Sequence, residues 1–344
     1  MRSRFLSGFV LAVICFVGTA FVIYALSVPR PQNIQGAKQE STRGRNSRER
    51  GGISDVLSRL RLLPFGSRER DLFSVIIENH EDARRYQQGL PKALLIQEYP
   101  VEGFITRFLA TFAVDDVPEL LGPVRSLRPY FVETVLPWKT PLLFAGGSPE
   151  ALERAGNVEG LTAINGLRYP KEFMRDDGIP APHNLFVDEK AVLFLVNEHQ
   201  AHVEWPPYTL GAALRGSGAL SIMIDYSNPA HNTVYTFDYF SQGYIRDNGG
   251  MTSDTRPRNV LIMEIPVTSI SEYGRLWIPL IGQGRAVLFR EGRVIQATWK
   301  RQNFDAWFTL EQESGSPLLF ARGQTWMTVV PAMDRVKWSE KRER

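Results

Sequence analysis

The chain of 344 residues contains a single cysteine, Cys15, and only five histidines. One thiol excludes a disulfide within the chain and excludes a metal site built from several thiolates. Cys15 lies inside an apolar run and follows Ile14, where the attachment of a lipid to cysteine requires a small residue. We therefore do not interpret Cys15 as a lipidation site.

The sequence also lacks the short motifs of common catalytic nucleophiles and a strong charge imbalance. It contains no Gly-x-Ser-x-Gly, no Ser-x-x-Lys and no His-Glu-x-x-His, which excludes the sequence patterns of serine hydrolases and zinc proteases. The net charge of +3 comes mainly from the stretch between Pro29 and Arg70. Because the rest of the chain is close to neutral, we expect no nucleic-acid partner.

What the chain does have is a long apolar segment at its start. Phe5 to Leu26 carries no charge and follows Arg2 and Arg4. About 20 such residues cross a bilayer as a helix, whereas the hydrophobic region of a cleavable signal is about 7–15 residues long. We predict an uncleaved signal anchor that crosses the cell membrane once and leaves the body outside the cytoplasm. Cleavage after Ala25-Leu26-Ser27 is the alternative.

The composition and hydrophobic pattern of the sequence change along the chain and predict five parts. Residues 1–28 form a cytoplasmic stub and a transmembrane anchor, and residues 29–70 a basic flexible linker. Residues 71–205 alternate between strand-like and helix-like runs, which predicts an α/β layered module. Residues 206–334 contain short strand-like runs between turn signals, which predicts a smaller, mostly-β module. Residues 335–344 form a charged tail, and the predicted fold class is α+β.

Individual elements follow from local signals. Pro129 and Pro149 at first helical positions predict helices over Arg128–Leu136 and Pro149–Ala155, the second capped by Ser148. Glu81–Gln88 is also helix-like. Glu291-Gly292 predicts a hairpin turn. The expected strands include Leu72–Ile77, Ala93–Tyr99, Ile105–Val114, Leu142–Ala145, Leu220–Asp225, Thr233–Tyr239, Val260–Pro266, Arg275–Leu280, Ala286–Phe289, Val294–Trp299 and Thr325–Val330.

A series of short motifs resembles the YerB-like family of bacterial envelope lipoproteins, a two-module domain of unknown function. In the first half the motifs are Asn79-His80, Glu98, Glu102-Gly103-x-x-Thr106-Arg107-Phe108, Gly122-Pro-x-Arg-Ser-x-Arg-Pro-Tyr130, Gly146-Gly147-Ser148, Arg168, Arg175-Asp176 and Pro182-His-Asn184. In the second half they are Tyr244-x-Arg246, Asp254, Asn259-Val260, Gly282-x-Gly284-x-Ala286, Gly292, Thr298-Trp299 and Gly323-Gln-Thr-Trp326. The resemblance covers Leu72 to Pro331 and implies two α+β modules outside the cytoplasm, but no established reaction. Members are typically anchored through a lipidated cysteine, whereas this chain is predicted to use a helix.

The residues themselves predict a site for an anion. A glycine-rich turn between a strand and a helix offers free amide hydrogens to a phosphate or carboxylate, and arginines add bidentate contacts. The alternative is a structural network in which the arginines pair with Glu98, Glu102 and Glu133. The predicted ligand-binding set is Arg107, Arg125, Ser126, Arg128, Gly146, Gly147, Ser148 and Asn184.

A second group has the residue types for proton transfer: His80, Glu98, Glu102 and His183 are the catalytic candidates.

The first functional hypothesis is a module that binds an anionic envelope component or a partner protein. The alternative is an enzyme acting on a phosphorylated or glycan envelope substrate. We predict no cofactor and no metal, and interpret Glu198-His199-x-x-His202-x-Glu204 as a solvated connector rather than a metal site.

Overall fold

The computed structural model describes residues 67–197, 202–212, 216–272 and 274–341. The predicted membrane helix over Phe5–Leu26 and most of the basic linker lie outside these residues. In the described part of the chain, no helix has both the length and the apolar character needed to cross a bilayer.

The described residues form many strands and few helices. The first half contains β1 (Arg68–Glu78), β2 (Leu95–Pro100), β3 (Thr106–Ala113), β4 (Leu120–Leu121), α3 (Pro129–Val135), β5 (Leu142–Phe144), α4 (Pro149–Asn157), β6 (Ala163–Asn165), β7 (Phe173–Arg175), β8 (Leu185–Asp188), α5 (Glu189–Val196) and β9 (His202–Trp205). The second half contains β10 (Ser217–Gly218), β11 (Ser221–Ile224), β12 (Thr233–Asp238), β13 (Gly243–Asn248), β14 (Met251–Thr252), β15 (Asn259–Glu264), β16 (Thr268–Ser269), β17 (Leu276–Trp277), β18 (Gly282–Arg290), β19 (Arg293–Arg301), β20 (Thr309–Gln312), β21 (Thr325–Val330) and β22 (Val336–Ser339).

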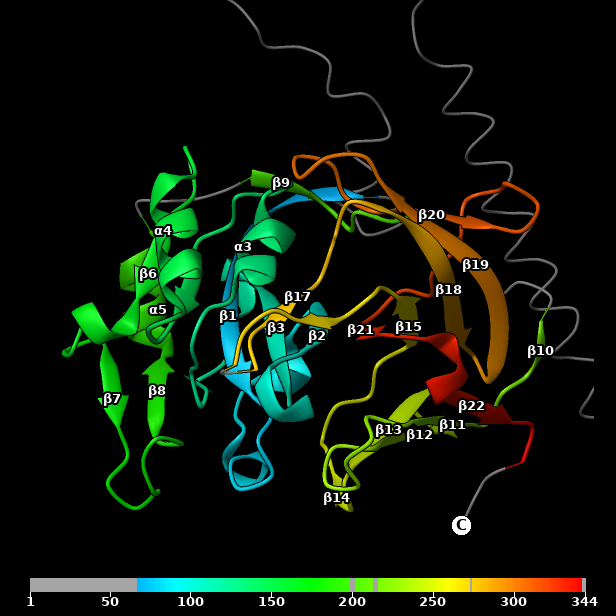
Figure 1. The fold of residues 1–344 in the computed structure, drawn as a ribbon, viewed down its shortest axis with the longest axis horizontal. Helices are drawn as coiled ribbons and strands as arrows, with labels where there is room; N and C mark the ends of the chain where they lie inside the picture. Colours follow the sequence, from blue (N-terminus) through cyan, green and yellow to red (C-terminus); the bar gives the residue numbers. More distant parts are fainter. Residues whose placement is uncertain (1–66, 198–201, 213–215, 273, 342–344) are drawn as a thin grey trace, which may run out of the picture. The chain divides into compact units, whose positions relative to one another are not determined.

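One twelve-stranded mixed sheet runs through both halves of the sequence (Figure 1). Its order is β10-β19-β18-β15-β21-β2-β3-β1-β5-β6, with β20 paired to β19 and β9 to β1. The two halves join where β21 lies between β2 and β15 and pairs in parallel with each of them. Smaller sheets are formed by β14-β13-β12-β11-β22, by β4-β8-β7 and by β16-β17.

The predicted fold class is therefore wrong. An N-terminal α/β layered module requires helices between parallel strands, but β1 pairs with β3, and β3 with β2, in antiparallel fashion. The α-helices of the described residues are three short ones of 7, 9 and 8 residues. The described protein is mostly β, and the same large sheet carries strands from both expected modules.

The run Glu81–Gln88 accounts for part of this error, because its helical pattern does not produce an α-helix. The chain forms a turn and a short 3-10 helix over Arg84–Tyr86. Arg84 is buried, and its guanidinium donates to the carbonyls of Asn79, Ala230 and Asn248. These tertiary hydrogen bonds hold the backbone in a conformation that local helix propensity does not favour.

Several local predictions are confirmed. Ser148 caps α4 by accepting a hydrogen bond from the Ala151 amide, with Pro149 at the first helical position. Glu291 and Gly292 connect β18 to β19 with φ angles of 52° and 69°, the left-handed pair that a tight hairpin turn requires. The predicted strand Thr325–Val330 has the same bounds as β21.

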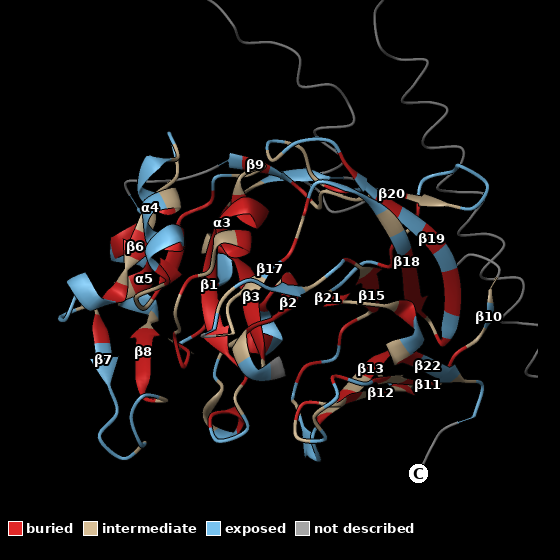
Figure 2. Ribbon diagram, in the orientation of Figure 1, coloured by how far each residue is buried: buried red, intermediate tan, exposed pale blue. Residues whose placement is uncertain are grey.

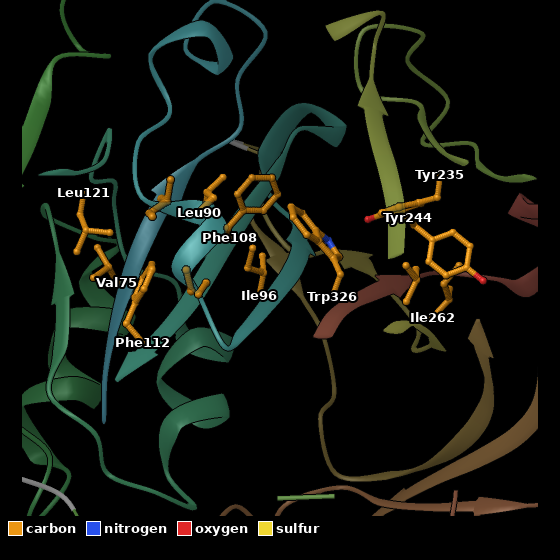
Figure 3. Packing of buried hydrophobic residues seen from close by; sticks show 14 of the residues in the cluster. Val75, Leu90, Ile96, Phe108, Phe112, Leu121, Tyr235, Tyr244, Ile262 and Trp326 are labelled. Carbon is orange, nitrogen blue, oxygen red and sulfur yellow. The ribbon is translucent and has the colours of Figure 1, made fainter. Parts of the chain in front are cut away.

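The central strands are buried on both faces, and their side chains join the two halves. Every residue of β2, β3 and β21 is buried, as the red ribbons in Figure 2 show. In Figure 3, Trp326 of β21 lies between Phe108 of β3 and Tyr235 of β12; its ring centroid is 5.1 Å from that of Phe108 and 6.3 Å from that of Tyr235. Such edge-to-face contacts add to the gain from burying apolar surface.

Glu98 of β2, a predicted catalytic residue, lies inside this core with no exposed surface. One nitrogen of Arg246 lies 3.0 Å and 3.2 Å from its two oxygens, Trp326 Nε1 donates to it at 2.8 Å, and the Thr106 hydroxyl donates at 2.6 Å. Burial alone would lower the pKa of Arg246, but the adjacent Glu98 charge raises it. Glu98 and Arg246 thus form a buried, hydrogen-bonded ion pair.

We expect Glu98→Gln to destabilise the protein by about 3–5 kcal/mol, because it leaves the Arg246 charge buried without its counter-ion. Denaturant unfolding of the purified protein measures the loss. Glu153→Gln, an exposed carboxylate on α4, is the control and should change stability by less than about 0.5 kcal/mol. Equal stabilities of the two variants would contradict this role for the ion pair.

Candidate functional site

The predicted arginines lie at the ends of central elements of the fold. Arg107 is the second residue of β3 and faces Glu78 of β1 in the strand register. The segment carrying Arg125 and Arg128 then runs beside the turn that follows β5: Arg125 bonds to Ala145, and Leu127 to Gly146, through backbone hydrogen bonds. Backbone hydrogen bonds thus place the segment that carries Arg125 and Arg128 beside the diglycine turn.

Two of the arginines have carboxylate partners. Arg125 Nε lies 2.9 Å from Glu78 Oε1, an ion pair whose N–H is not aligned for a hydrogen bond. Arg128 makes a bidentate pair with Glu102, with distances of 2.6 Å and 2.8 Å. Burial would raise the pKa of Glu102, but the hydrogen bond and charge of Arg128 outweigh burial and lower it.

Arg107 differs from its neighbours. It is only 8% exposed, and the hydrogen bond that the described residues provide for its guanidinium is to the Ser126 carbonyl, at 2.7 Å. None of the described carboxylates lies within ion-pair distance of it. Burial and repulsion from Arg128 and Arg125 lower its pKa to about 10. Arg107 is thus a buried cation without an ion pair to any described residue, and the attraction of Glu102 only partly offsets the effects that lower its pKa.

The glycine turn is occupied by the protein's own groups. The Gly146 amide donates to Asn165 Oδ1 at 2.9 Å, and the Ser148 amide donates to the Leu127 carbonyl. Gly146 has a φ of +66°, and a Cβ on Gly147 would lie 3.1 Å from the Leu127 side chain. The left-handed backbone thus favours a glycine at Gly146, and close packing leaves little room for a side chain at Gly147, whether or not a ligand binds.

The helix end beyond this turn is also engaged. The Ser148 side chain caps α4, and a hydrogen bond to its own backbone amide lowers the pKa of Glu150. A carboxylate of the chain thus already lies where we expected an anion.

Two other predicted ligand-binding residues have structural contacts. The Ser126 hydroxyl donates to the Ala145 carbonyl at 3.0 Å. Asn184 is buried, accepts from Arg175 at 2.7 Å and donates to the Asp176 carbonyl. Their roles in ligand binding stay predictions, and their visible contacts organise the loops around the arginines.

Both histidine candidates lie close to the arginine cluster. His183 Nδ1 is 3.0 Å from Glu78 Oε2, so that Glu78 contacts His183 with one oxygen and Arg125 with the other. The imidazole rings of His80 and His183 are 5.2 Å apart.

Sequence reasoning missed three residues here: Glu78, Arg84 and His231. The His231 ring lies 6.5 Å from that of His80, and its Nδ1 is 2.6 Å from an Arg84 nitrogen. Burial and the Arg84 charge lower the pKa of His231. Glu78 directly precedes the Asn79-His80 motif, which was an available signal, whereas no local pattern around His231 connects it to a residue about 150 positions earlier.

The connector that we predicted to be solvated is partly described. His202 Nδ1 is 2.6 Å from Asp71 on the paired strand β1, and Glu204 accepts a hydrogen bond from Ser67. Glu198 and His199 lie outside the described residues.

Comparison with known proteins identifies the class. Residues 66–202 match the domain described as "Protein of unknown function (DUF3048) N-terminal domain", and residues 222–327 match the corresponding C-terminal domain. The described fold thus belongs to a two-domain class without an assigned activity.

Individual relatives agree with this class. The chain is 31% identical over 288 residues to "Putative lipoprotein YerB" of Bacillus subtilis (strain 168), covering 79% of this chain and 85% of the relative. The crystal structure of the Bacillus subtilis YerB protein matches with a TM-score of 0.69 and 29% identity, over 79% of this chain and 94% of that one. The chain belongs to the YerB-like family, and the resemblance seen in the sequence motifs is confirmed.

The lowered pKa of Glu102 makes part of the stability depend on pH. Its charged form is favoured by folding, so its contribution is fully present above the usual value of 4.5 and is lost as pH falls through the lowered folded value. We expect Glu102→Gln to cost about 1.5–3 kcal/mol at pH 7 and to lose less further stability on acidification than the wild type. Thermal unfolding between pH 7 and pH 3 measures both effects.

The exposed Glu313→Gln variant is the control for this experiment and should follow the wild type at every pH. Parallel loss of stability in the wild type and in Glu102→Gln would contradict the assigned role of the Arg128–Glu102 pair.

Proposed function

We propose that the protein binds an anionic component of the bacterial envelope, or an acidic segment of a partner protein, through Arg107 and the neighbouring Arg125 and Arg128. The observation that carries this proposal is the incomplete neutralisation of the cluster. Arg125 and Arg128 form ion pairs with Glu78 and Glu102, whereas no described carboxylate forms an ion pair with Arg107. An anion beside Arg107 would supply the missing charge.

Energetics favour a ligand over an empty site. A buried charge without a counter-ion is costly, and proteins retain one where it is paired or functional. A planar guanidinium binds a phosphate or carboxylate through two parallel hydrogen bonds, and such charge-assisted bonds are the stronger kind. Arg107 has donors beyond the one that reaches the Ser126 carbonyl, and these are available for such contacts.

The family relationship supports a location for this binding. The relative's name describes a lipoprotein, which for this chain supports attachment to the membrane with the body outside the cytoplasm. We propose that residues 1–28 provide this attachment.

Deletion of these residues should move the protein from the membrane fraction to the soluble fraction, as immunoblotting of fractionated cells will measure. Retention in the membrane fraction would contradict it.

An enzyme acting on a phosphorylated or glycan substrate is the second candidate. The observation that favours it is the shared carboxylate of Glu78, which contacts both Arg125 and His183. A proton-transferring imidazole thus lies next to the proposed anion site. Glu98 has no part in this candidate, because it is enclosed in the core with Arg246.

The test of the anion site is the substitution Arg107→Gln. Arg125 and Arg128 are less informative targets, because removing either leaves Glu78 or Glu102 without its cation. We expect Arg107→Gln to weaken binding of inorganic phosphate, and capture of anionic material from envelope extracts, by about tenfold or more. Arg107→Lys keeps the charge but not the planar guanidinium, so its phosphate affinity should lie between those of the wild type and Arg107→Gln. Isothermal titration calorimetry measures the phosphate affinity.

The matched control is Arg285→Gln, which removes an exposed guanidinium paired with Glu264 on the large sheet. It should bind phosphate and capture envelope material as the wild type does. Equal phosphate binding and equal capture by the wild type and by a folded Arg107→Gln variant would remove Arg107 from the proposed site.

A further inference from the structure

Three of the five histidines in the sequence meet in one place in the fold. His80 follows β1, His183 lies between β7 and β8, and His231 lies between β11 and β12. One potential ligand atom each from His80, Asp82 and His183 lie within 4.8 Å of one another. These three side chains come from two segments about 100 residues apart, so the fold itself assembles the group.

The contact between His183 and Glu78 resembles the one by which a carboxylate orients a metal-binding histidine. With Nδ1 3.0 Å from Glu78 Oε2, the imidazole hydrogen lies on Nδ1 and donates to the carboxylate. Nε2 then carries the free lone pair. A metal-binding histidine almost always donates its other N–H to a carboxylate, carbonyl or water in this way, which fixes the tautomer and the ring orientation.

The distances at His80 also suit a shared cation. His80 Nδ1 lies 3.6 Å from Asp82 Oδ2, whereas two tetrahedral zinc ligands with bonds of about 2.0–2.1 Å lie about 3.4 Å apart. The competing contact at His80 Nδ1 is a 3.3 Å hydrogen bond from the Asp82 amide, which is long for this type. The side chains of Asp82 and His80 are 67% and 28% exposed, so both can close on an ion.

His231 has a different role. Its Nδ1 accepts from Arg84 at 2.6 Å, and its Nε2 faces Glu81 at 3.0 Å. The hydrogen therefore lies on Nε2, and neither nitrogen offers a free lone pair. His231 holds the Glu81 carboxylate beside His80, whose Nδ1 lies 3.7 Å from it, and this carboxylate adds negative charge around the group.

We propose that His80, Asp82 and His183 bind a divalent transition-metal ion, with Zn²⁺ as the best fit to two imidazoles and one carboxylate. Glu78 is a positioning residue that orients His183. Three protein ligands leave one coordination position open to solvent, the arrangement found where zinc acts on a substrate rather than on the fold alone. Glu78 also contacts Arg125, so the proposed metal site and the arginine cluster share one carboxylate.

The experiment is a titration of the full-length protein, freed of metal by a chelator, with Zn²⁺ alone. Competition against a chromophoric chelator gives the affinity and stoichiometry, and Co²⁺ absorption in the visible range reports the ligand geometry. We expect one saturable site with a tetrahedral Co²⁺ spectrum. His80→Ala and His183→Ala each remove a metal ligand and should weaken Zn²⁺ binding strongly. The loss should exceed about 100-fold, because removing a residue that only orients a ligand already costs about 10–100-fold.

Glu78→Gln should weaken Zn²⁺ binding by about 10–100-fold. It should also shift the ¹⁵N resonances of His183 towards a mixture of tautomers, which a merely destabilising substitution would not do. His202→Ala removes an exposed histidine on β9 and should bind Zn²⁺ as the wild type does. Arg107→Gln should also bind Zn²⁺ normally when no phosphate is present, because the hydrogen bond of Arg107 goes to the Ser126 carbonyl and not to Glu78 or a proposed metal ligand.

Two results would overturn the metal site: unsaturable Zn²⁺ binding by the wild type, or equal affinity in the wild type, His80→Ala and His183→Ala. Normal Zn²⁺ binding together with unchanged phosphate binding by Arg107→Gln would refute the anion site and leave the metal site standing. Thermal unfolding of each variant without metal verifies that the compared proteins are folded.

Discussion

The ion pair between Glu98 and Arg246 is the interaction on which the rest of this fold depends. Its two charges are buried, and a buried charge is tolerated only when its partner and its hydrogen bonds are in place. Glu98 comes from β2, Arg246 from β13, and the indole that donates to Glu98 from β21. Separating the two halves of the chain would therefore leave Glu98 and Arg246 without their partners. The indole hydrogen bond also joins β21 to its neighbour β2 in the large sheet.

The same network extends from the core to the histidines. Thr106 donates to Glu98 and accepts from Asn79 at 2.6 Å, and Asn79 also donates to Asn248 at 2.8 Å. Asn79 immediately precedes His80, and Thr106 immediately precedes Arg107. One chain of buried hydrogen bonds thus fixes the backbone at the origin of both side-chain clusters. Such satisfied networks make a position rigid, and rigid support is what a binding constellation requires.

The sequence predicted structure correctly where neighbouring residues determine it. It was misleading where residues far apart in the chain determine it. The cap of α4 by Ser148 and the turn at Glu291-Gly292 depend on neighbouring residues, and both were predictable. The pairing of β21 with β2 joins residues about 230 positions apart, and no periodic pattern encodes it. The distant partners of Glu98 were equally invisible in the sequence: its charge suggested chemistry, but Arg246 and Trp326 enclose it in the core. The motifs shared with the family include both residues of the core, such as Glu98, and residues nearer the surface, such as His183. The motifs do not distinguish the two kinds.

Glu78 connects the two clusters, and its geometry determines how they influence each other. One oxygen contacts the Arg125 guanidinium and the other the His183 imidazole, so the two groups share a single carboxylate and its charge. A ligand that draws Arg125 away would leave more of that charge on His183, which would make its other nitrogen a better electron donor. Conversely, a metal ion bound to His183 would strengthen the hydrogen bond from His183 to Glu78 and weaken the contact between Glu78 and Arg125. Arg125 would then be freer to bind an anion. Occupation of either cluster would therefore favour occupation of the other, and this coupling needs no movement of the strands that carry them.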